Sequence, residues 1–336
     1  MTATSGPARS GWSPALQAVD LVKTYPGGRR GPRVRALDGL SVEVPAGSVF
    51  ALLGPNGAGK STTIKILTTL SRPDSGQARV AGVDVLTRPE AVRHVIGLVS
   101  QKASSDPMAT GRENLELAAR IQGMSRQEAR ARSTELLGRF ALTDAADRLV
   151  KTWSGGMSRK LDVAIGLVHR PDVLFLDEPT TGLDPEARAE MWAEIGRLST
   201  REQVTVLLTT HYLDEADRLA ERLAIVDAGR IVVEGTPDQL KSELHGDAVH
   251  VELGSAQAAA GARGVLTRLG LREVTLDAAA DAAVVRARAD DGARAVPALI
   301  AALEEAGTPV ASVTVARPSL DDVYLRHVGR VLEVAA

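Results

Sequence analysis

The chain has 336 residues, of which 44% are hydrophobic and 24% are charged, and 40 Lys and Arg against 42 Asp and Glu leave a net charge of −2. This composition excludes an intrinsically disordered chain, and the balanced charge argues against nucleic acid as a partner. The absence of cysteine excludes disulfides and thiolate nucleophiles. No apolar run reaches the roughly 18 residues of a membrane span, and residues 1–15 lack the apolar core of a signal peptide. We therefore expect a two-domain cytoplasmic protein that meets a membrane only through a partner.

Residues 1–15 are rich in Ser, Thr, Gly, Pro and Ala and predict a flexible tail. Two short strands are then expected at residues 16–25 and 37–47, on either side of a Gly/Arg/Pro loop. Residues 48–67 predict an apolar strand, a Gly-rich turn and a helix, and residues 107–168 have the period of amphipathic helices.

Two apolar segments, residues 172–179 and 205–211, predict further strands. Because their apolar residues do not alternate with polar ones, we expect both faces of each strand to be buried, as in a parallel sheet. A third strand is expected at residues 94–101.

A domain boundary is expected near residue 245, where His245, Gly246 and Asp247 interrupt the pattern. The order strand, helix, strand, strand, helix, strand beyond it predicts a ferredoxin-like α+β unit. The predicted segments are 248–253, 256–270, 272–276, 282–288, 293–307 and 309–316. The apolar residues expected to pack between its sheet and helices are Val249, Val251, Leu253, Leu266, Leu269, Leu299, Leu303, Val313 and Val315. Ser319 and Asp322 predict the capping box of a last helix.

Residues 54–61 read GPNGAGKS and match the phosphate-loop pattern G-x-x-x-x-G-K-[ST]. Glycines let backbone N–H groups surround a phosphate, and the helix that follows directs its positive end at the same anion. Lys60 would reach the β and γ oxygens, and Ser61 would bind Mg²⁺. A chance match in a Gly-rich turn is the alternative, but the flanking strand and helix favour the functional interpretation. The expected nucleotide-binding residues here are Gly54, Pro55, Asn56, Gly57, Ala58, Gly59, Lys60, Ser61 and Thr62.

The apolar strand at 172–179 ends in Asp177 and Glu178. Successive side chains of a strand point to opposite sides, so we expect the two acids to serve separate roles. Asp177 would contact Mg²⁺ through a water molecule of its coordination shell, and Glu178 would face an attacking water. An acidic strand end in solvent is the alternative when the segment is taken alone.

Between these motifs lies WSGGMSRKL, in which Ser154 is a natural N-cap. Gly155 and Gly156 have no side chains and leave the N-terminus of the following helix uncovered. A capped turn is the simple interpretation, and a second anion-binding helix end is the functional one. Here the sequence resembles the ATP-binding-cassette (ABC) ATPases, whose signature LSGGQ lies just before the Asp-Glu strand. The Leu and Gln of that signature are replaced by Trp153 and Met157, whereas the three phosphate-facing residues are kept.

Five further residues match landmarks of this family and take their roles from the resemblance alone. Gln101 matches the Q-loop glutamine that senses Mg²⁺ and water, and His211 matches the switch histidine that touches the γ-phosphate. Leu183 and Asp184 match the D-loop, which crosses the dimer interface. Tyr25 matches the aromatic residue that stacks on adenine.

The resemblance covers about residues 16–240 and implies an α/β P-loop NTPase cassette at 16–245, with a mixed-sheet core and a helical subdomain at about 102–168. Residues 246–336 would form an accessory domain. The family hydrolyses ATP with Mg²⁺, so Lys60, Gln101, Glu178 and His211 are the expected catalytic residues. Two cassettes associate head to tail, and Ser154, Gly155 and Gly156 act on the ATP of the partner.

The C-terminal segment RPSLDDVYLRHVG and the segment after Gln101 resemble ATP-binding subunits of the daunorubicin-resistance type. These pair with a separate ABC-2-type integral membrane permease and export drugs, antibiotics or lipid-linked glycans. The resemblance therefore implies a peripheral protein on the cytoplasmic face of the cell membrane. A soluble ABC ATPase with a repair, translation or regulatory role, and an importer ATPase, stay open as alternatives.

Overall fold

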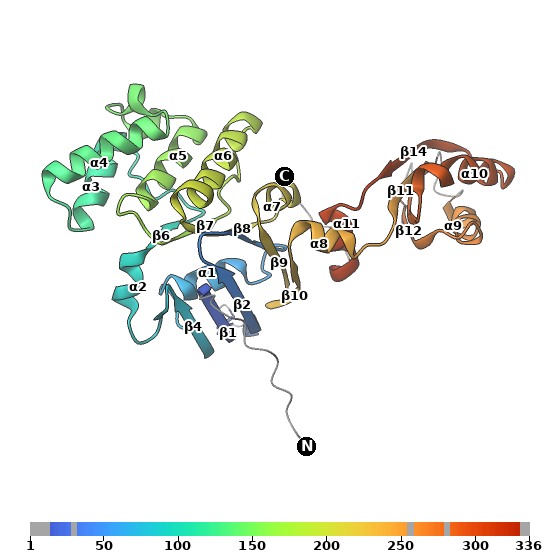
Figure 1. The fold of residues 1–336 in the computed structure, drawn as a ribbon, viewed down its shortest axis with the longest axis horizontal. Coiled ribbons are helices and arrows are strands. Elements are labelled where there is room, and N and C mark those ends of the chain that lie inside the picture. The colour runs from blue at the N-terminus through green and yellow to red at the C-terminus, as the bar shows by residue number, and fades with distance from the viewer. Residues whose placement is uncertain (1–13, 28–31, 254–258, 279–282, 330–336) are drawn as a thin grey trace, which may run out of the picture. The chain divides into compact units, whose positions relative to one another are not determined.

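The structure is a computed structural model that describes residues 14–27, 32–253, 259–278 and 283–329. These residues form two compact units, one ending at Pro237 and one starting at Asp238 (Figure 1). The expected tail lies outside the described residues, except that Pro14 and Ala15 already belong to the first strand.

The first unit contains two sheets. An antiparallel sheet has the order β2-β1-β4-β5 and consists of β1 (Pro14–Tyr25), β2 (Val34–Pro45), β4 (Ser75–Val80) and β5 (Val83–Asp84). The second sheet has the order β10-β9-β3-β8-β7-β6. Its strands are β3 (Val49–Leu53), β6 (Ile96–Val99), β7 (Val173–Asp177), β8 (Thr205–Thr210), β9 (Arg222–Asp227) and β10 (Arg230–Gly235).

All neighbours in this second sheet are parallel except β9 and β10. Every residue of β3, β7 and β8 is buried. For β7 and β8 this confirms the burial on both faces that their unbroken apolar character predicts. The sheet is therefore mixed.

Helices connect and cover these strands. They are α1 (Lys60–Leu67), α2 (Pro89–Val95), α3 (Gly111–Ile121), α4 (Arg126–Arg139), α5 (Gly155–Gly166), α6 (Pro185–Glu202) and α7 (Leu213–Leu219). Helix α8 (Pro237–Ser242) begins at the last residue of this unit and continues into the second unit. Helices α3, α4 and α5 pack on one another, and α5 also contacts β6 and α6 (Figure 1). Capping boxes at Thr110 and Ser125 start α3 and α4. The helical character expected between residues 107 and 168 is thus confirmed.

The strand expected at 94–101 is shorter than predicted. Pro89 occupies the first turn of α2, a position that suits its fixed φ, and the helix continues through His94 and Val95. The strand β6 consequently covers only Ile96–Val99, and Gln101 lies in the loop after it.

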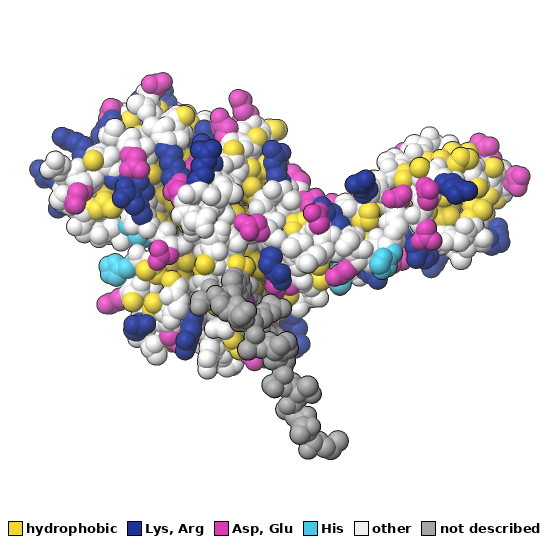
Figure 2. Space-filling model, in the orientation of Figure 1, with side chains coloured by type: hydrophobic (Ala, Val, Ile, Leu, Met, Phe, Trp, Pro, Cys, Tyr) yellow, Lys and Arg dark blue, Asp and Glu magenta, His cyan; other side chains and the backbone are white. Residues whose placement is uncertain are grey.

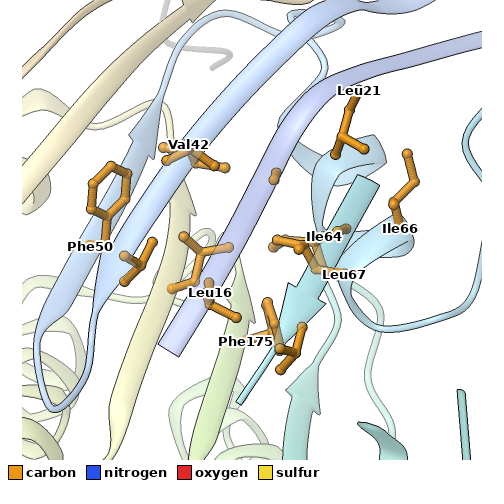
Figure 3. Packing of buried hydrophobic residues seen from close by; sticks show 14 of the residues in the cluster. Leu16, Leu21, Val42, Phe50, Ile64, Ile66, Leu67 and Phe175 are labelled. Atoms are coloured by element: carbon orange, nitrogen blue, oxygen red, sulfur yellow. The ribbon is translucent and has the colours of Figure 1, made fainter. Parts of the chain in front are cut away.

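Helix α1 contacts strands of both sheets and forms the centre of the main core (Figure 3). Large apolar side chains from α1, β1, β2, β3 and β7 meet there, among them Leu16, Leu21, Val42, Phe50, Ile64, Ile66, Leu67 and Phe175. Fully burying such a side chain stabilises the fold by about 1.5–3 kcal/mol. Because α1 begins with Lys60 and Ser61, the last two residues of the phosphate-loop motif, this core holds the motif in place.

The second unit has a four-stranded sheet of order β12-β13-β11-β14, in which all neighbours are antiparallel. Its strands are β11 (Asp247–Leu253), β12 (Arg272–Ala278), β13 (Ala283–Ala289) and β14 (Val310–Ala316), and its helices are α9 (Ala259–Arg268), α10 (Gly292–Glu305) and α11 (Leu320–Val328). The capping box of Ser319 and Asp322 at the start of α11 is confirmed.

The predicted core of this unit forms with one exception, Leu269. Its side chain is 40% exposed, because α9 ends at Arg268 and the chain turns at Gly270, where φ is +81°. Leu271 takes the buried position instead, at 6% exposure.

No helix among residues 14–27, 32–253, 259–278 and 283–329 is long and apolar enough to cross a bilayer. On the face that Figure 2 shows, Lys and Arg side chains are interspersed with Asp and Glu.

Candidate nucleotide-binding and hydrolysis site

The phosphate-loop motif forms a tight turn between β3 and α1. The N–H of Ala58 donates to the oxygen of Pro55 at 3.2 Å, and the N–H of Thr63 donates to that of Gly59 at 2.9 Å, which begins the helix. Gly59 has a φ of +113°, and a Cβ built on it would lie 2.6 Å from the oxygen of Ala36. Only glycine fits this position. Gly57 has a φ of +82° and open space where a Cβ would be, so its backbone can approach a ligand.

Lys60 is the first residue of α1 and is 5% exposed. Its Nζ donates to the backbone oxygens of Gly54 at 2.5 Å and of Pro55 at 3.1 Å, so the ammonium group lies within the loop. Burial lowers the pKa of Lys60, and the nearby charges of Glu178 and Asp177 oppose this shift. An anionic ligand in the loop would find a desolvated cation beside it.

Asp177 joins three elements at the end of β7. Its Oδ1 accepts from the Ser61 hydroxyl at 3.1 Å and from the Thr209 hydroxyl at 2.6 Å. Ser61 lies on α1 and Thr209 on β8, so this carboxylate links the phosphate loop to the sheet.

Glu178 lies just past β7, in a left-handed backbone conformation with φ of +49°. Its N–H donates to the backbone oxygen of Thr209 at 3.1 Å. Its Oε2 accepts from the Gln101 side-chain amide at 3.1 Å, and its Oε1 lies 3.2 Å from Nδ1 of His211. The two acids do face different groups, but strand alternation is not the reason, because the strand ends at Asp177 and the chain turns at Glu178.

Gln101, Glu178 and His211 thus meet at the carboxyl ends of β6, β7 and β8, which are adjacent parallel strands. His211 is 5% exposed, and its ring centroid lies 4.2 Å from that of Tyr212. Ligands of open α/β sheets bind beyond the carboxyl ends of the strands, which is where Lys60 and Ser61 also lie. Residues far apart in the sequence therefore form one polar cluster.

The signature residues occupy a different part of this unit. Ser154 caps α5, its hydroxyl accepting from the N–H of Met157 at 3.2 Å, as predicted. A Cβ at Gly155 would meet nothing within 4 Å, whereas one at Gly156 would lie 2.9 Å from Cβ of Ala187. Within the described part of the chain, no hydrogen bond or ion pair joins Ser154, Gly155 or Gly156 to the phosphate loop.

Within the described residues, no hydrogen bond or ion pair joins the other expected residues to this cluster either. Asp184 caps α6 by accepting from the N–H of Ala187 at 2.8 Å, and Leu183 before it is 8% exposed. Tyr25 ends β1, with Nζ of Lys23 5.4 Å from its ring centroid.

Sequence reasoning missed three buried polar residues that contact this region: Arg159, Thr209 and Glu215. Arg159 donates to backbone oxygens around Asp177 and Glu178, and Thr209 orients Asp177. Glu215, on α7, accepts from the Thr180 hydroxyl at 2.8 Å and from the Trp192 indole at 3.1 Å. In the sequence these residues are marked only by lying near motifs. Arg159 is within the signature segment, Thr209 is two residues before His211, and Glu215 is four residues after His211.

A Gly-rich loop that opens a helix beside acidic strand ends is the phosphate-binding arrangement of the P-loop NTPases. Comparisons with known proteins narrow this class. Residues 37–181 match the family model "ABC transporter", and residues 235–328 match "ATP-binding protein DrrA1-3-like, C-terminal domain". The daunorubicin/doxorubicin resistance ATP-binding protein DrrA of Streptomyces peucetius is 48% identical over 94% of this chain and 92% of its own.

Two further proteins are similar over the cassette. The Nod factor export ATP-binding protein I of Burkholderia orbicola is 46% identical over 64% of this chain and 71% of its own. The ATP-binding cassette MJ0796, solved as a dimer in a post-hydrolysis state with ADP and Pi, has a TM-score of 0.61 and 26% identity, and covers 66% of this chain and 98% of its own. The chain therefore belongs to the DrrA-type ATP-binding proteins of the ABC transporter family, and it is an ABC ATPase that binds and hydrolyses ATP.

Proposed function

We propose that this chain is the ATP-hydrolysing subunit of an export complex that moves a drug, antibiotic or lipid-like molecule through a separate ABC-2-type permease. The observation that supports this most is the similarity to the daunorubicin/doxorubicin resistance protein, which extends beyond the cassette through the C-terminal domain. Planar, partly apolar compounds such as these two drugs are the first cargo to test. The Nod factor export relative favours export over import.

We assign the hydrolytic roles to the cluster at the strand ends. Glu178 is the group that accepts a proton from the attacking water. The Gln101 side-chain amide donates to its Oε2, and Nδ1 of His211 lies 3.2 Å from its Oε1. Lys60 and the N–H groups of residues 54–62 neutralise and orient the phosphates. Phosphoryl transfer needs mainly positioning and charge neutralisation, and these groups supply both.

Mg²⁺ fits beside the phosphate loop. The Ser61 hydroxyl and the side-chain oxygen of Gln101 would be its protein ligands, because this ion prefers oxygen. The Asp177 carboxylate lies 3.1 Å from the Ser61 hydroxyl. When bound, the ion would add positive charge at the phosphates. Asp177 would act on it through a water molecule.

We infer that the site is completed by a second copy of the chain. Among the described residues, Ser154, Gly155 and Gly156 make no hydrogen bond to the phosphate loop of their own chain, and the exposed end of α5 is suited to an anion of another molecule. The dimeric MJ0796 cassette supports this arrangement. Leu183 and Asp184 would then lie at the dimer interface, and Tyr25 would stack on the adenine.

We further propose the domain plan of a cassette at residues 16–245, with a helical subdomain at about 102–168, and an accessory domain at 246–336. The compact units of the structure divide eight residues before this boundary, after Pro237. The sheet order β12-β13-β11-β14, with every neighbour antiparallel, supports a ferredoxin-like topology for that domain. Its role would be dimer assembly or coupling. The complex would lie at the cytoplasmic face of the cell membrane, with contact to the bilayer through the permease only.

Two experiments test the export role. The Glu178→Gln protein with Mg-ATP serves as bait for solubilised native membranes, and we expect it to recover an integral membrane protein. In cells that lack the native chain, the wild type should lower doxorubicin accumulation, whereas Lys60→Ala should not. Recovery of soluble proteins alone, together with equal accumulation in both strains, would move the assignment to a non-transport ABC ATPase.

A further inference from the structure

Arg159, on the second turn of α5, connects the ends of two strands through backbone oxygens. Its side chain is 8% exposed. Nη1 donates to the oxygen of Ser100 at 2.7 Å, the residue directly before Gln101. Nη2 donates to the oxygens of Asp177 at 3.0 Å and Glu178 at 3.1 Å, and Nε donates to that of Pro179 at 2.9 Å. One guanidinium thus holds both backbone segments that carry the Gln101–Glu178 contact.

Asp162 lies one turn further along α5 and holds the other end of the Gln101 segment. It is 2% exposed, and its Oδ1 accepts from the N–H groups of Ser104 and Ser105, both at 3.0 Å. The loop that carries Gln101 is therefore fixed before and after that residue by two side chains of the same helix. Ser154 caps the N-terminus of that helix.

The charge and the planar shape of the Arg159 guanidinium suit it to fixing these two backbone segments. Burial lowers the pKa of Arg159, and the carboxylates of Asp162, Asp177, Glu215 and Glu178 oppose the shift. The planar fork of arginine can satisfy four carbonyl oxygens at once, which a lysine ammonium at the same place cannot do. None of these hydrogen bonds reaches a phosphate-loop residue, so Arg159 acts through the backbone of other residues.

We propose that Arg159, assisted by Asp162, is a positioning residue that sets the distance between Gln101 and Glu178 for hydrolysis. This inference rests on the proposed role of that pair. Without the Arg159 guanidinium, the turn after β7 and the loop after β6 could shift relative to each other. A misplacement of about 1 Å at a reacting group can cost about 100-fold in rate. Binding of ATP through the phosphate loop would persist.

The test compares Arg159→Lys with Arg132→Lys. Arg132 is a matched control, because it is also 8% exposed and donates to two backbone oxygens beyond the other end of α5, those of Leu167 at 2.7 Å and Val168 at 3.1 Å. We expect both variants to unfold at a lower temperature than wild type. Arg159→Lys should lose about 10- to 100-fold in kcat with the Kd for ATP within about threefold, whereas Arg132→Lys should keep its kcat.

Two substitutions of Asp162 test the positioning role independently if Arg159→Lys does not fold. Asp162→Asn keeps the Oδ1 acceptor and should retain most of the wild-type kcat, whereas Asp162→Ala should lose kcat as Arg159→Lys does. Equal kcat in Arg159→Lys and Arg132→Lys, equal kcat in the two Asp162 variants, or a loss of ATP affinity as large as the loss of kcat would overturn the positioning role. If Glu178→Gln hydrolyses ATP at the wild-type rate, the proposed role of Gln101 and Glu178 in hydrolysis is wrong instead, and the inference loses its basis.

Discussion

Gln101 donates from Nε2 to Oε2 of Glu178 at 3.1 Å, across 77 positions of the sequence. The contact exists because β6 and β7 are adjacent and parallel, so their carboxyl ends lie side by side. The loop that follows β6 leads into the helices α3 and α4, whereas Glu178 lies at the proposed hydrolysis site. A change in the helical part of the cassette that moves this loop would therefore alter the surroundings of Glu178 directly.

Lys60→Ala should lower kcat/KM for ATP by about 100-fold or more, because the desolvated phosphates would lose their main cationic partner. Lys65→Ala is the control: Lys65 lies on the same helix and is exposed. Steady-state hydrolysis with both variants measures the difference. Wild-type turnover by Lys60→Ala would remove the phosphate loop from the mechanism.

Gly155→Ala should leave folding and ATP binding intact and still reduce hydrolysis by at least about tenfold. Apart from its chain neighbours and the backbone of its own helix, the added methyl group meets no described atom within 4 Å, so it would project where the partner's phosphate is expected. Gly156→Ala should instead lower the free energy of unfolding, by about 1–3 kcal/mol, because its methyl group would lie 2.9 Å from Cβ of Ala187.

Thermal unfolding, nucleotide binding and ATPase rates of the two glycine variants give the comparison. If Gly155→Ala hydrolyses ATP at the wild-type rate, the end of α5 does not act on a second molecule.

Glu215→Gln should gain stability relative to wild type as the pH rises. Burial raises the pKa of Glu215, and hydrogen bonds from Thr210, Thr180 and Trp192 oppose the shift only in part. The folded protein thus keeps a proton that the unfolded chain releases above its own pKa of about 4.3. The stability from this carboxyl is complete below that value and is lost as the pH rises through the raised, folded-state pKa.

Glutamine mimics the neutral carboxyl and does not titrate. The melting temperature of Glu215→Gln minus that of wild type should therefore increase from pH 5 to pH 8 at constant ionic strength. A difference that stays constant or decreases over this range would show that Glu215 is not held neutral.

Local features of the site could be predicted from the sequence. The Gly-rich loop and the cap at Ser154 depend on neighbouring residues, and each forms where its motif lies. The burial of β7 also follows from its apolar run. Motif recognition was therefore sufficient to locate the Gly-rich loop, Asp177, Glu178 and His211 as candidates for one site.

Features that depend on tertiary contacts could not be predicted in this way. Arg159 looks like an ordinary surface residue of an amphipathic helix, and only the fold brings the oxygens of Ser100 and Asp177 to it. The conformation of Glu178 is set by its backbone hydrogen bond to Thr209 on the neighbouring strand. Leu269 is exposed because α9 ends at Arg268, two residues before the end of the predicted segment, and the chain turns at Gly270.

Glu178→Gln offers the most direct test of a nucleotide site shared by two copies of the chain. The substitution keeps the shape of the side chain and removes the proton acceptor, so bound ATP should persist. Size-exclusion chromatography with light scattering measures the mass with Mg-ATP and with Mg-ADP. We predict twice the mass of one chain with ATP and the mass of one chain with ADP. A single-chain mass with ATP, in a sample that equilibrium binding shows to be saturated, would contradict the shared site.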